Sequence, residues 1–231
     1  MKERPVIFNG EMVRAILDGR KTQTRRAISD RHLHLIDVAS QVGECYPLES
    51  GIDHANSQSY YREHCPFGQV GDRLWVREAY QGPLFNFDQM ETYLEDTSKF
   101  ERPEFCEYRA DGGRTPEYYD ADDNLRHGWK PSIHMPRWAS RILLEITAVR
   151  VERLNDISEA DAINEGIDAD SLAESQDNYD CIADHNMTGR PTAKGHFSDL
   201  WQSIYGEESW AANPWVWVIE FKRVEVRDAS K

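Results

Sequence analysis

A short, strongly basic segment near the N-terminus carries the densest chemical signal in this sequence: Gly19-Arg20-Lys21-Thr22-Gln23-Thr24-Arg25-Arg26. It places four cations and two hydroxyls within eight residues. A run of charge is most often a solvated turn, and that explanation stays open. The alternative is catalytic: Lys21 takes the proton of a neighbouring threonine and thereby activates the hydroxyl as a nucleophile.

The catalytic alternative requires an uncharged lysine. The pKa of a free lysine side chain is about 10.4, so burial or neighbouring cations must lower it. Arg20, Arg25 and Arg26 are the cations that the segment supplies. An arginine there is also suited to stabilise a developing oxyanion.

Three helices are predicted from apolar spacing and end signals. The first covers about residues 10–18, with Asn9 as its cap and Gly19 at its end. The second begins at Ser158, which opens a capping box, and Gly166 is its expected stop. The third covers about residues 197–205.

Strands are predicted at residues 73–77, 142–151 and 215–226, the last rich in β-branched and aromatic residues. In the second of them the apolar alternation shifts phase near Ala148, which indicates a bulge or bend. Early and late strands around few helices predict an α+β fold, a small, mostly antiparallel β-barrel with helices packed outside.

The length of 231 residues, with 39% hydrophobic residues, predicts one packed domain over residues 1–231. The net charge of −14 is uneven: residues 83–125 contribute −8, residues 151–190 contribute −9, and the rest of the chain is +3. Stretches at about 83–125 and 168–196 are polar and lack apolar periodicity, so they are predicted to be acidic, loop-like insertions. A mildly basic core suits a small nucleoside or nucleotide, whereas acidic insertions repel a long phosphate chain.

Several other classes of protein are disfavoured. No apolar run approaches the ~20 residues that span a bilayer, and the N-terminus lacks an apolar targeting region, so we expect a cytoplasmic protein without a membrane partner. The four cysteines form no CxxC pair. We therefore expect free thiols, no metal site and no cofactor. We also expect a monomer.

The basic segment resembles the G-x-K-x-x-E-x-R signature of the ASCH domain family, whose fold is a PUA-like β-barrel. Gly19, Lys21 and Arg26 stand at signature positions, and Thr24 replaces the usual glutamate. The same replacement occurs in the small bacterial N4-acetylcytidine amidohydrolases, which this segment resembles more closely. Residues 71–76, 129–139 and 217–221 also resemble ASCH proteins, of which longer members are common in phages and prophages.

The resemblance implies roles for three residues. In the amidohydrolases the signature lysine accepts a proton, the threonine is the nucleophile, and a glutamate at the end of a later helix donates a proton. These roles fall on Lys21, Thr24 and Glu165. Glu165 precedes Gly166, at the negative end of its helix, where the dipole favours a protonated carboxyl group. Glu159, nearer the start of that helix, is the rival acid.

Five further residues are predicted to bind the substrate. Arg26 belongs to the signature, and Trp75 and Trp138 are candidates for stacking on a base. A place in the hydrophobic core is the common alternative for both tryptophans. Arg77 and Glu78 follow Trp75 on opposite faces of the strand, and Glu78 is suited to accept a hydrogen bond from an exocyclic amine.

The function expected from the resemblance is hydrolysis of a non-peptide C–N bond. The enzyme would remove the acetyl or acyl group from N4-acetylcytidine or a related N-acylated pyrimidine nucleoside, through a lysine-activated threonine. Two alternatives stay open. One is a ribonuclease acting on single-stranded RNA, which the wider family suggests. The other is a non-catalytic reader of a modified base or RNA, as other PUA-like barrels are.

Overall fold

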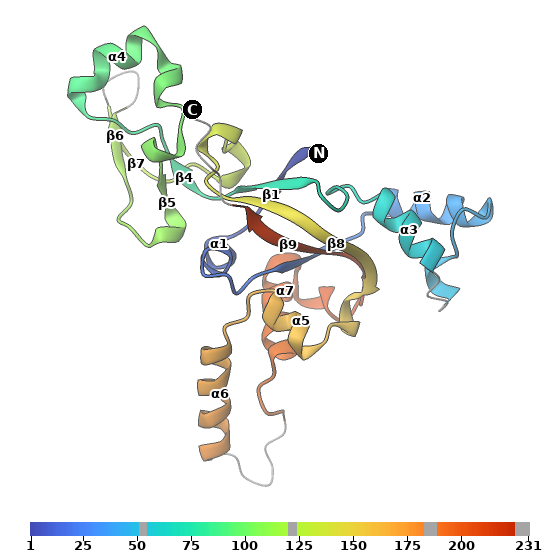
Figure 1. The fold of residues 1–231 in the computed structure, drawn as a ribbon. Helices are drawn as coiled ribbons and strands as arrows, with labels where there is room; N and C mark the ends of the chain where they lie inside the picture. The colour runs from blue at the N-terminus through green and yellow to red at the C-terminus, as the bar shows by residue number, and fades with distance from the viewer. Residues whose placement is uncertain (51–54, 120–123, 183–188, 225–231) are drawn as a thin grey trace. The chain divides into compact units, whose positions relative to one another are not determined.

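The computed structural model describes residues 1–50, 55–119, 124–182 and 189–224, and Figure 1 shows helices and strands mixed along the chain. The helices are α1 (Gly10–Leu17), α2 (Asp30–Gln41), α3 (Ala55–Glu63), α4 (Met90–Glu95), α5 (Glu159–Asn164), α6 (Ala169–Ile182) and α7 (Ala193–Tyr205). The strands are β1 (Glu3–Ile7), β2 (Gln23–Ala27), β3 (Arg73–Arg77), β4 (Tyr80–Gln81), β5 (Glu107–Tyr108), β6 (Glu117–Tyr119), β7 (Leu125–His127), β8 (Leu143–Arg153) and β9 (Trp215–Val224). Within these ranges, none of the helices has both the length and the apolar character that crossing a membrane requires.

Five strands form one mixed sheet in the order β1-β3-β8-β9-β2. β1 is parallel to β3, whereas β3 is antiparallel to β8 and β2 is antiparallel to β9. A parallel pair needs a long crossover, and α1, β2, α2 and α3 separate β1 from β3 in the chain. The predicted α+β class is confirmed. The predicted closed barrel is not found, because the described strands form a sheet whose order ends at β1 and β2.

The chain divides into two compact units, each built from early and late segments. The first unit comprises residues 1–17 and 73–145 together with the end of the chain from Arg223, and the second comprises residues 18–72 and 146–222. The sequence predicts a single domain over the same residues. Each unit is described by itself.

The first unit has a small aromatic core. Tyr80, Tyr108, Met135 and Ala139 are buried together, and Trp138 packs against them. Tyr80 in β4 lies opposite Tyr108 in β5, and the Tyr108 hydroxyl donates to the Ala139 carbonyl oxygen at 2.8 Å. These contacts join β4 and β5 to the segment that leads into β8.

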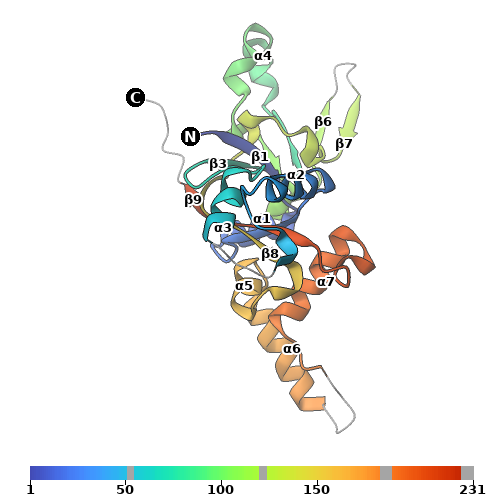
Figure 2. The ribbon, with the colours of Figure 1, turned by 90° about the vertical axis from the view of Figure 1, so that its right-hand side faces the viewer.

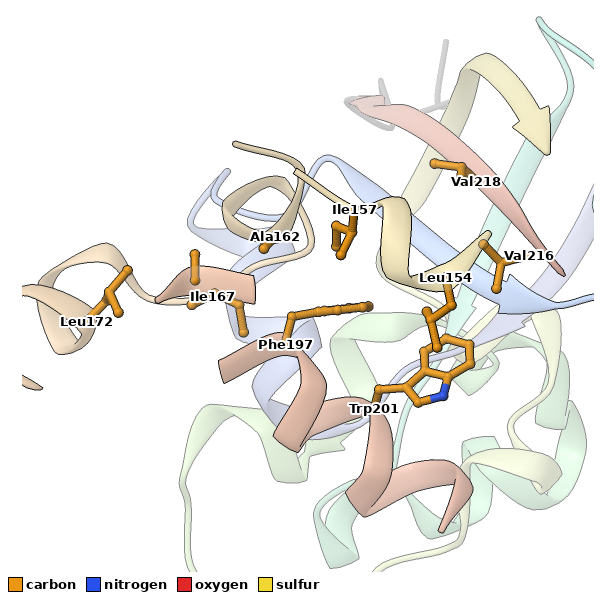
Figure 3. Packing of buried hydrophobic residues seen from close by; sticks show 10 residues of the cluster. Leu154, Ile157, Ala162, Ile167, Leu172, Phe197, Trp201, Val216 and Val218 are labelled. Atoms are coloured by element: carbon orange, nitrogen blue, oxygen red, sulfur yellow. The ribbon is translucent and has the colours of Figure 1, made fainter. Parts of the chain in front are cut away.

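The second unit has the larger apolar cluster, in which α5 and α7 pack against β9 (Figure 3). Phe197 and Trp201 project from α7 toward Leu154 and Ile157, and Val218 belongs to the same cluster. Aromatic side chains bury about 150–250 Å² each, so Phe197 and Trp201 are large single contributors to this core. This cluster positions α5, whose last turn leads to Glu165.

The predicted helices are confirmed where local end signals are strong. The Asn9 Oδ1 atom accepts a hydrogen bond from the Met12 backbone N–H at 2.8 Å at the start of α1. The Ser158 hydroxyl accepts from the Asp161 N–H at 3.0 Å at the start of α5. The third helix is longer than predicted, because Thr192 caps it and α7 begins at Ala193.

The predicted strands are confirmed as β3, β8 and β9 as far as the described residues extend. The phase shift in β8 is also present, since Leu144 and Ile146 are buried before it and Val149 and Val151 after it. Several elements are not predicted from the sequence, namely α2, α3, α4 and α6, and β1, β2 and β4 to β7. Among them, α4 lies within the stretch 83–125, which is predicted to be loop-like. Gln23–Ala27, within the basic segment, forms strand β2, and α6 occupies part of the stretch 168–196 that is predicted to be loop-like. Figures 1 and 2 show α6 projecting beyond α5 and α7.

The signal for α6 is weak because Leu172 is the one residue of this helix that is buried. Apolar periodicity, which identifies amphipathic helices, is therefore missing.

Candidate functional site

The basic segment and the end of α5 lie side by side in the second unit. The Thr22 backbone N–H donates to the Asn164 carbonyl oxygen at 2.9 Å. Glu165 caps the C-terminus of α5, and Gly166 follows with a φ of +100°, which turns the chain away from the helix. This turn fixes the Glu165 side chain beside Lys21.

Lys21 and Glu165 form a buried ion pair. The Lys21 Nζ atom lies 2.8 Å from Glu165 Oε2 and 2.7 Å from the Glu165 carbonyl oxygen. The two side chains are 0% and 2% exposed. Burial lowers the pKa of Lys21, the charge and hydrogen bond of Glu165 oppose that effect, and Arg26 and Arg25 lower the pKa further. The lysine is thus biased toward the neutral form that a proton acceptor needs.

Arg25 holds the other oxygen of the same carboxylate. Its NH1 atom donates to Glu165 Oε1 at 3.2 Å, and its NH2 atom donates to Glu152 at 3.1 Å and to Asp161 at 3.4 Å. The Arg25 side chain is 0% exposed. Gln23 completes this arrangement, because its amide nitrogen can donate to Asp161 at 3.2 Å while its oxygen accepts from Arg25.

A second arginine, Arg150, extends the network toward solvent. It pairs with Glu152 and Glu220 and lies 3.5 Å from Asp161, with 26% of its side chain exposed. Burial raises the pKa of Asp161, but the charges of Arg25 and Arg150 and the hydrogen bonds from Ser158 and Gln23 outweigh it and lower the pKa overall. Asp161 is therefore held ionised beside Arg25.

Thr24 lies on the opposite face of β2 from Arg25. Side chains alternate along a strand, and the α5-facing side carries Gln23 and Arg25. Thr24 pairs with Ile219 in β9, and Arg26 pairs with Trp217. Thr24 is buried, with 2% of the residue exposed. β2 is the last strand in the order of the sheet, so one of its edges is not paired with another described strand. The face that carries Thr24 and the face that carries Arg25 meet along this free edge.

Glu159, the rival acid, has a different task. Its carboxylate accepts from the backbone N–H groups of Ala193 at 2.7 Å and Lys194 at 3.4 Å. These groups open α7, where a negative charge is favourable. Glu159 therefore joins the start of α7 to α5, whereas Glu165 is the carboxylate beside Lys21.

The other predicted substrate-binding residues belong to the first unit. The Arg77 guanidinium lies 5.4 Å from the centre of the Trp75 ring, and its Nε donates to the Met135 carbonyl oxygen at 3.1 Å. Trp138 packs against the aromatic core of that unit. Trp75 and Trp138 are each partly exposed rather than fully buried.

Glu78 is buried and paired within the first unit. Both of its carboxylate oxygens accept from Arg141, at 3.0 and 3.1 Å, and Arg141 also binds Asp111. Burial raises the pKa of Glu78, and Arg141 opposes that effect. Glu78 also lines a pocket of about 570 Å³ together with Asn9, Arg14 and Arg109.

The structure therefore brings Lys21 and Glu165 together, as the resemblance implies. It adds Arg25 as a direct partner of Glu165, and Asp161 and Glu152 as further partners of Arg25. From the sequence, Arg25 is expected to lower the pKa of Lys21 or to stabilise an oxyanion, and its contact with Glu165 is not predicted. Its position two residues after Gln23 in a strand indicates that the two side chains share a face. The described residues contain no cluster of histidine, cysteine or acidic side chains suited to a metal ion, and all four cysteines are free.

No protein-family model matches the sequence, and no curated protein matches it. Among solved structures, the chain is similar to a high-resolution crystal structure of the ASCH domain from Lactobacillus crispatus JV V101. The identity is 15% and the TM-score 0.33, over 96% of this chain and 79% of that chain. The matched structure is an ASCH domain, and residues 19–26 of this chain resemble the signature of the ASCH domain family. Because the TM-score is so low, the function is inferred from the residues and contacts described above.

Proposed function

We propose that this protein hydrolyses the amide of an N-acylated pyrimidine nucleoside such as N4-acetylcytidine. The observation that carries the proposal is the fully buried Lys21–Glu165 pair, with its lowered Lys21 pKa, three residues before Thr24 in the chain. The resemblance of residues 19–26 to the amidohydrolase segment supplies the substrate class. Acyl transfer needs a nucleophile, a base and an acid, and the segment with α5 offers all three.

The pair supplies the base and the acid through one shared proton. In the ion pair, that proton resides on Lys21. Its transfer across 2.8 Å to Glu165 Oε2 yields neutral Lys21 and protonated Glu165 at the same time. Burial reduces the free-energy gap between the two forms, because both partners of the ion pair lose hydration. No proton from solvent is needed to reach the reactive form.

In the proposed reaction the Thr24 oxygen attacks the acyl carbonyl while Lys21 accepts the hydroxyl proton. The C–N bond then breaks, and Glu165 donates its proton to the departing N4 amine. Water hydrolyses the acyl-Thr24 ester, which releases the carboxylic acid and restores the hydroxyl. Each proton taken by Lys21 is matched by one given by Glu165, so the cycle balances.

The position of Thr24 imposes a condition on the substrate. Since Thr24 and Arg25 lie on opposite faces of β2, the scissile amide must be held at the free edge of this strand. Lys21 and Thr22 precede the strand and are not bound by its alternation. The beginning of β2 is therefore where the nucleophile and the Lys21–Glu165 pair can meet one substrate.

The test is turnover of N4-acetylcytidine by the purified protein, followed by loss of the acetylated chromophore and by acetate release. We expect Lys21→Ala, Thr24→Ala and Glu165→Gln to lose activity by roughly a hundredfold or more. Glu159→Gln, in the same helix, should retain it. Mass spectrometry of a rapidly quenched reaction should find an acetyl group on Thr24.

Activity that survives both Lys21→Ala and Thr24→Ala would overturn the proposal. Cleavage of labelled single-stranded RNA without deacetylation would favour a ribonuclease instead. Binding of the nucleoside by the wild type without product would favour a non-catalytic reader.

A further inference from the structure

Arg25, in the second unit, is a fully buried cation with several acidic partners. Its side chain is 0% exposed and contacts three carboxylates, those of Glu165, Glu152 and Asp161. These partners come from α5, from β8 and from the residue that follows α5. A buried arginine with ionised partners on both of its terminal nitrogens has little freedom to move.

The two oxygens of Glu165 have separate partners as a result. Oε1 accepts from Arg25 at 3.2 Å, and Oε2 accepts from Lys21 at 2.8 Å. The backbone of Arg25 is itself fixed, since Arg25 lies opposite Val218 in the β2–β9 ladder and Val218 is buried in the apolar cluster with α5 and α7. The carboxylate is therefore held by a strand that is anchored to the same core as its own helix.

We propose that Arg25 is a positioning residue for the Lys21–Glu165 pair: its guanidinium occupies one oxygen of Glu165, so that the other oxygen is directed to Lys21 and to the leaving amine. The effect of Arg25 on catalysis rests on the proposed hydrolase function. Its effect on the geometry and the pKa of the Lys21–Glu165 pair does not depend on that function. A carboxylate with one oxygen fixed presents a single, directed site for proton transfer. An unheld carboxylate could turn either oxygen toward Lys21 or away from it.

The positive charge of Arg25 also lowers the pKa of Lys21, as burial does. The charged groups around Lys21 are Glu165, at the end of α5, and Arg25 and Arg26, both in β2. Arg25 in turn binds Asp161 and Glu152. Arg150 also binds Glu152. Burial is the main cause that lowers the pKa of Lys21, and the positive charge of Arg25 adds to it. Loss of Arg25 therefore raises the pKa of Lys21.

The experiment compares Arg25→Gln, Arg25→Lys and Arg150→Gln in the full chain. Arg150 is the matched control, because it binds Glu152 and Asp161 as Arg25 does but has no contact with Glu165 in the described structure. The first readout is the titration of Lys21 by NMR of isotopically labelled lysine, with Lys21→Met used to assign the signal. This readout needs no substrate, so it separates the positioning role from the proposed reaction.

We expect Arg25→Gln to raise the pKa of Lys21 and Arg150→Gln to leave it near the wild-type value. With substrate, Arg25→Gln should lower kcat roughly tenfold to a hundredfold with little change in KM, because a misplaced acid slows chemistry rather than binding. Arg25→Lys should keep the Lys21 titration closer to wild type yet still lower kcat, since an ammonium cannot bridge the same carboxylates.

Two results would overturn the proposal: a Lys21 titration unchanged in Arg25→Gln, or an equal shift in Arg150→Gln. Thermal unfolding of each variant checks folding. If Arg25→Gln does not unfold cooperatively, Arg25→Lys carries the test, and wild-type kcat in that variant refutes the positioning role. If the wild type has no deacetylase activity, the proposed function fails while the titration still decides the structural role.

Discussion

Replacement of Glu165 by glutamine should destabilise the protein in a pH-dependent way. The variant leaves two cations, Lys21 and Arg25, facing a neutral amide, and both side chains are 0% exposed. Removal of one member of a buried ion pair costs about 3–5 kcal/mol. Arg25 keeps Glu152 and Asp161 as partners, so we expect about 3 kcal/mol at neutral pH, the lower end of that range. For a chain of this size that corresponds to a decrease in Tm of roughly 6–12 °C.

The pH dependence follows from the pKa of Lys21. Burial lowers this pKa below its ordinary value, and Glu165 opposes that effect. Glu165→Gln removes the opposing effect, so the pKa of Lys21 falls further in the variant. At pH values between the lowered pKa of Lys21 in the folded protein and its pKa in the unfolded chain, Lys21 is protonated mainly in the unfolded chain. The free energy of unfolding therefore rises with pH over this interval. That interval is wider in the variant, so its deficit should shrink as the pH rises toward 10.

Thermal unfolding followed by tryptophan fluorescence at pH 7 and pH 9.5 measures both effects. Glu159→Gln is the control, because it makes the same change at the first residue of α5, whereas Glu165 caps the other end of that helix, and it affects only the hydrogen bonds to the start of α7. We expect it to cost about 1 kcal/mol, as for other helix-capping groups, with no recovery at alkaline pH. A deficit for Glu165→Gln no larger than that of the control, or one that grows with pH, would refute this reasoning.

Two further predictions concern the first unit. Glu78→Gln should lower stability by about 1–3 kcal/mol, because Arg141 loses an ionised partner but keeps Asp111; denaturant unfolding that matches wild type would contradict this. Gly82→Ala should be destabilising by about 1–3 kcal/mol, since an added Cβ would lie 2.6 Å from the Cys106 Sγ atom and 2.9 Å from the Phe105 carbonyl oxygen; Gly113→Ala, where nothing lies within 4 Å, is the matched control, and equal Tm values for the two would count against the clash.

The parts of the fold that sequence predicts are those with local causes. Asn9 and Ser158 cap α1 and α5 because the accepting side chain lies three residues from the donor in each case. β2 is different, because its polar sequence reads as a basic turn and its strand geometry comes from pairing with β9, almost two hundred residues later. The open end of the sheet is likewise a property of pairing between distant strands.

In the candidate site, too, the contacts between residues far apart in the chain are those that the sequence does not predict. Only the resemblance assigns Lys21 and Glu165 to one site, since 144 residues separate them in the chain. The three partners of Arg25 lie 127 to 140 residues away, and no periodicity or spacing rule connects positions so far apart. The sequence also gives no indication that Thr24 and Arg25 lie on opposite faces of a strand, because the strand β2 is itself not predicted.

The contact between Glu159 and the first turn of α7 has a practical consequence for protein engineering. It joins the first residue of α5 to the first residue of α7, at 2.7 Å for the Ala193 N–H, so this contact closes the loop formed by the intervening chain. The entropy of closing such a loop grows slowly with its length, by about 0.6 kcal/mol for each doubling. A peptide or whole domain inserted at the exposed Gly189, between α6 and α7, should therefore be accommodated without displacing Glu165, which makes this position suitable for a reporter or an affinity handle.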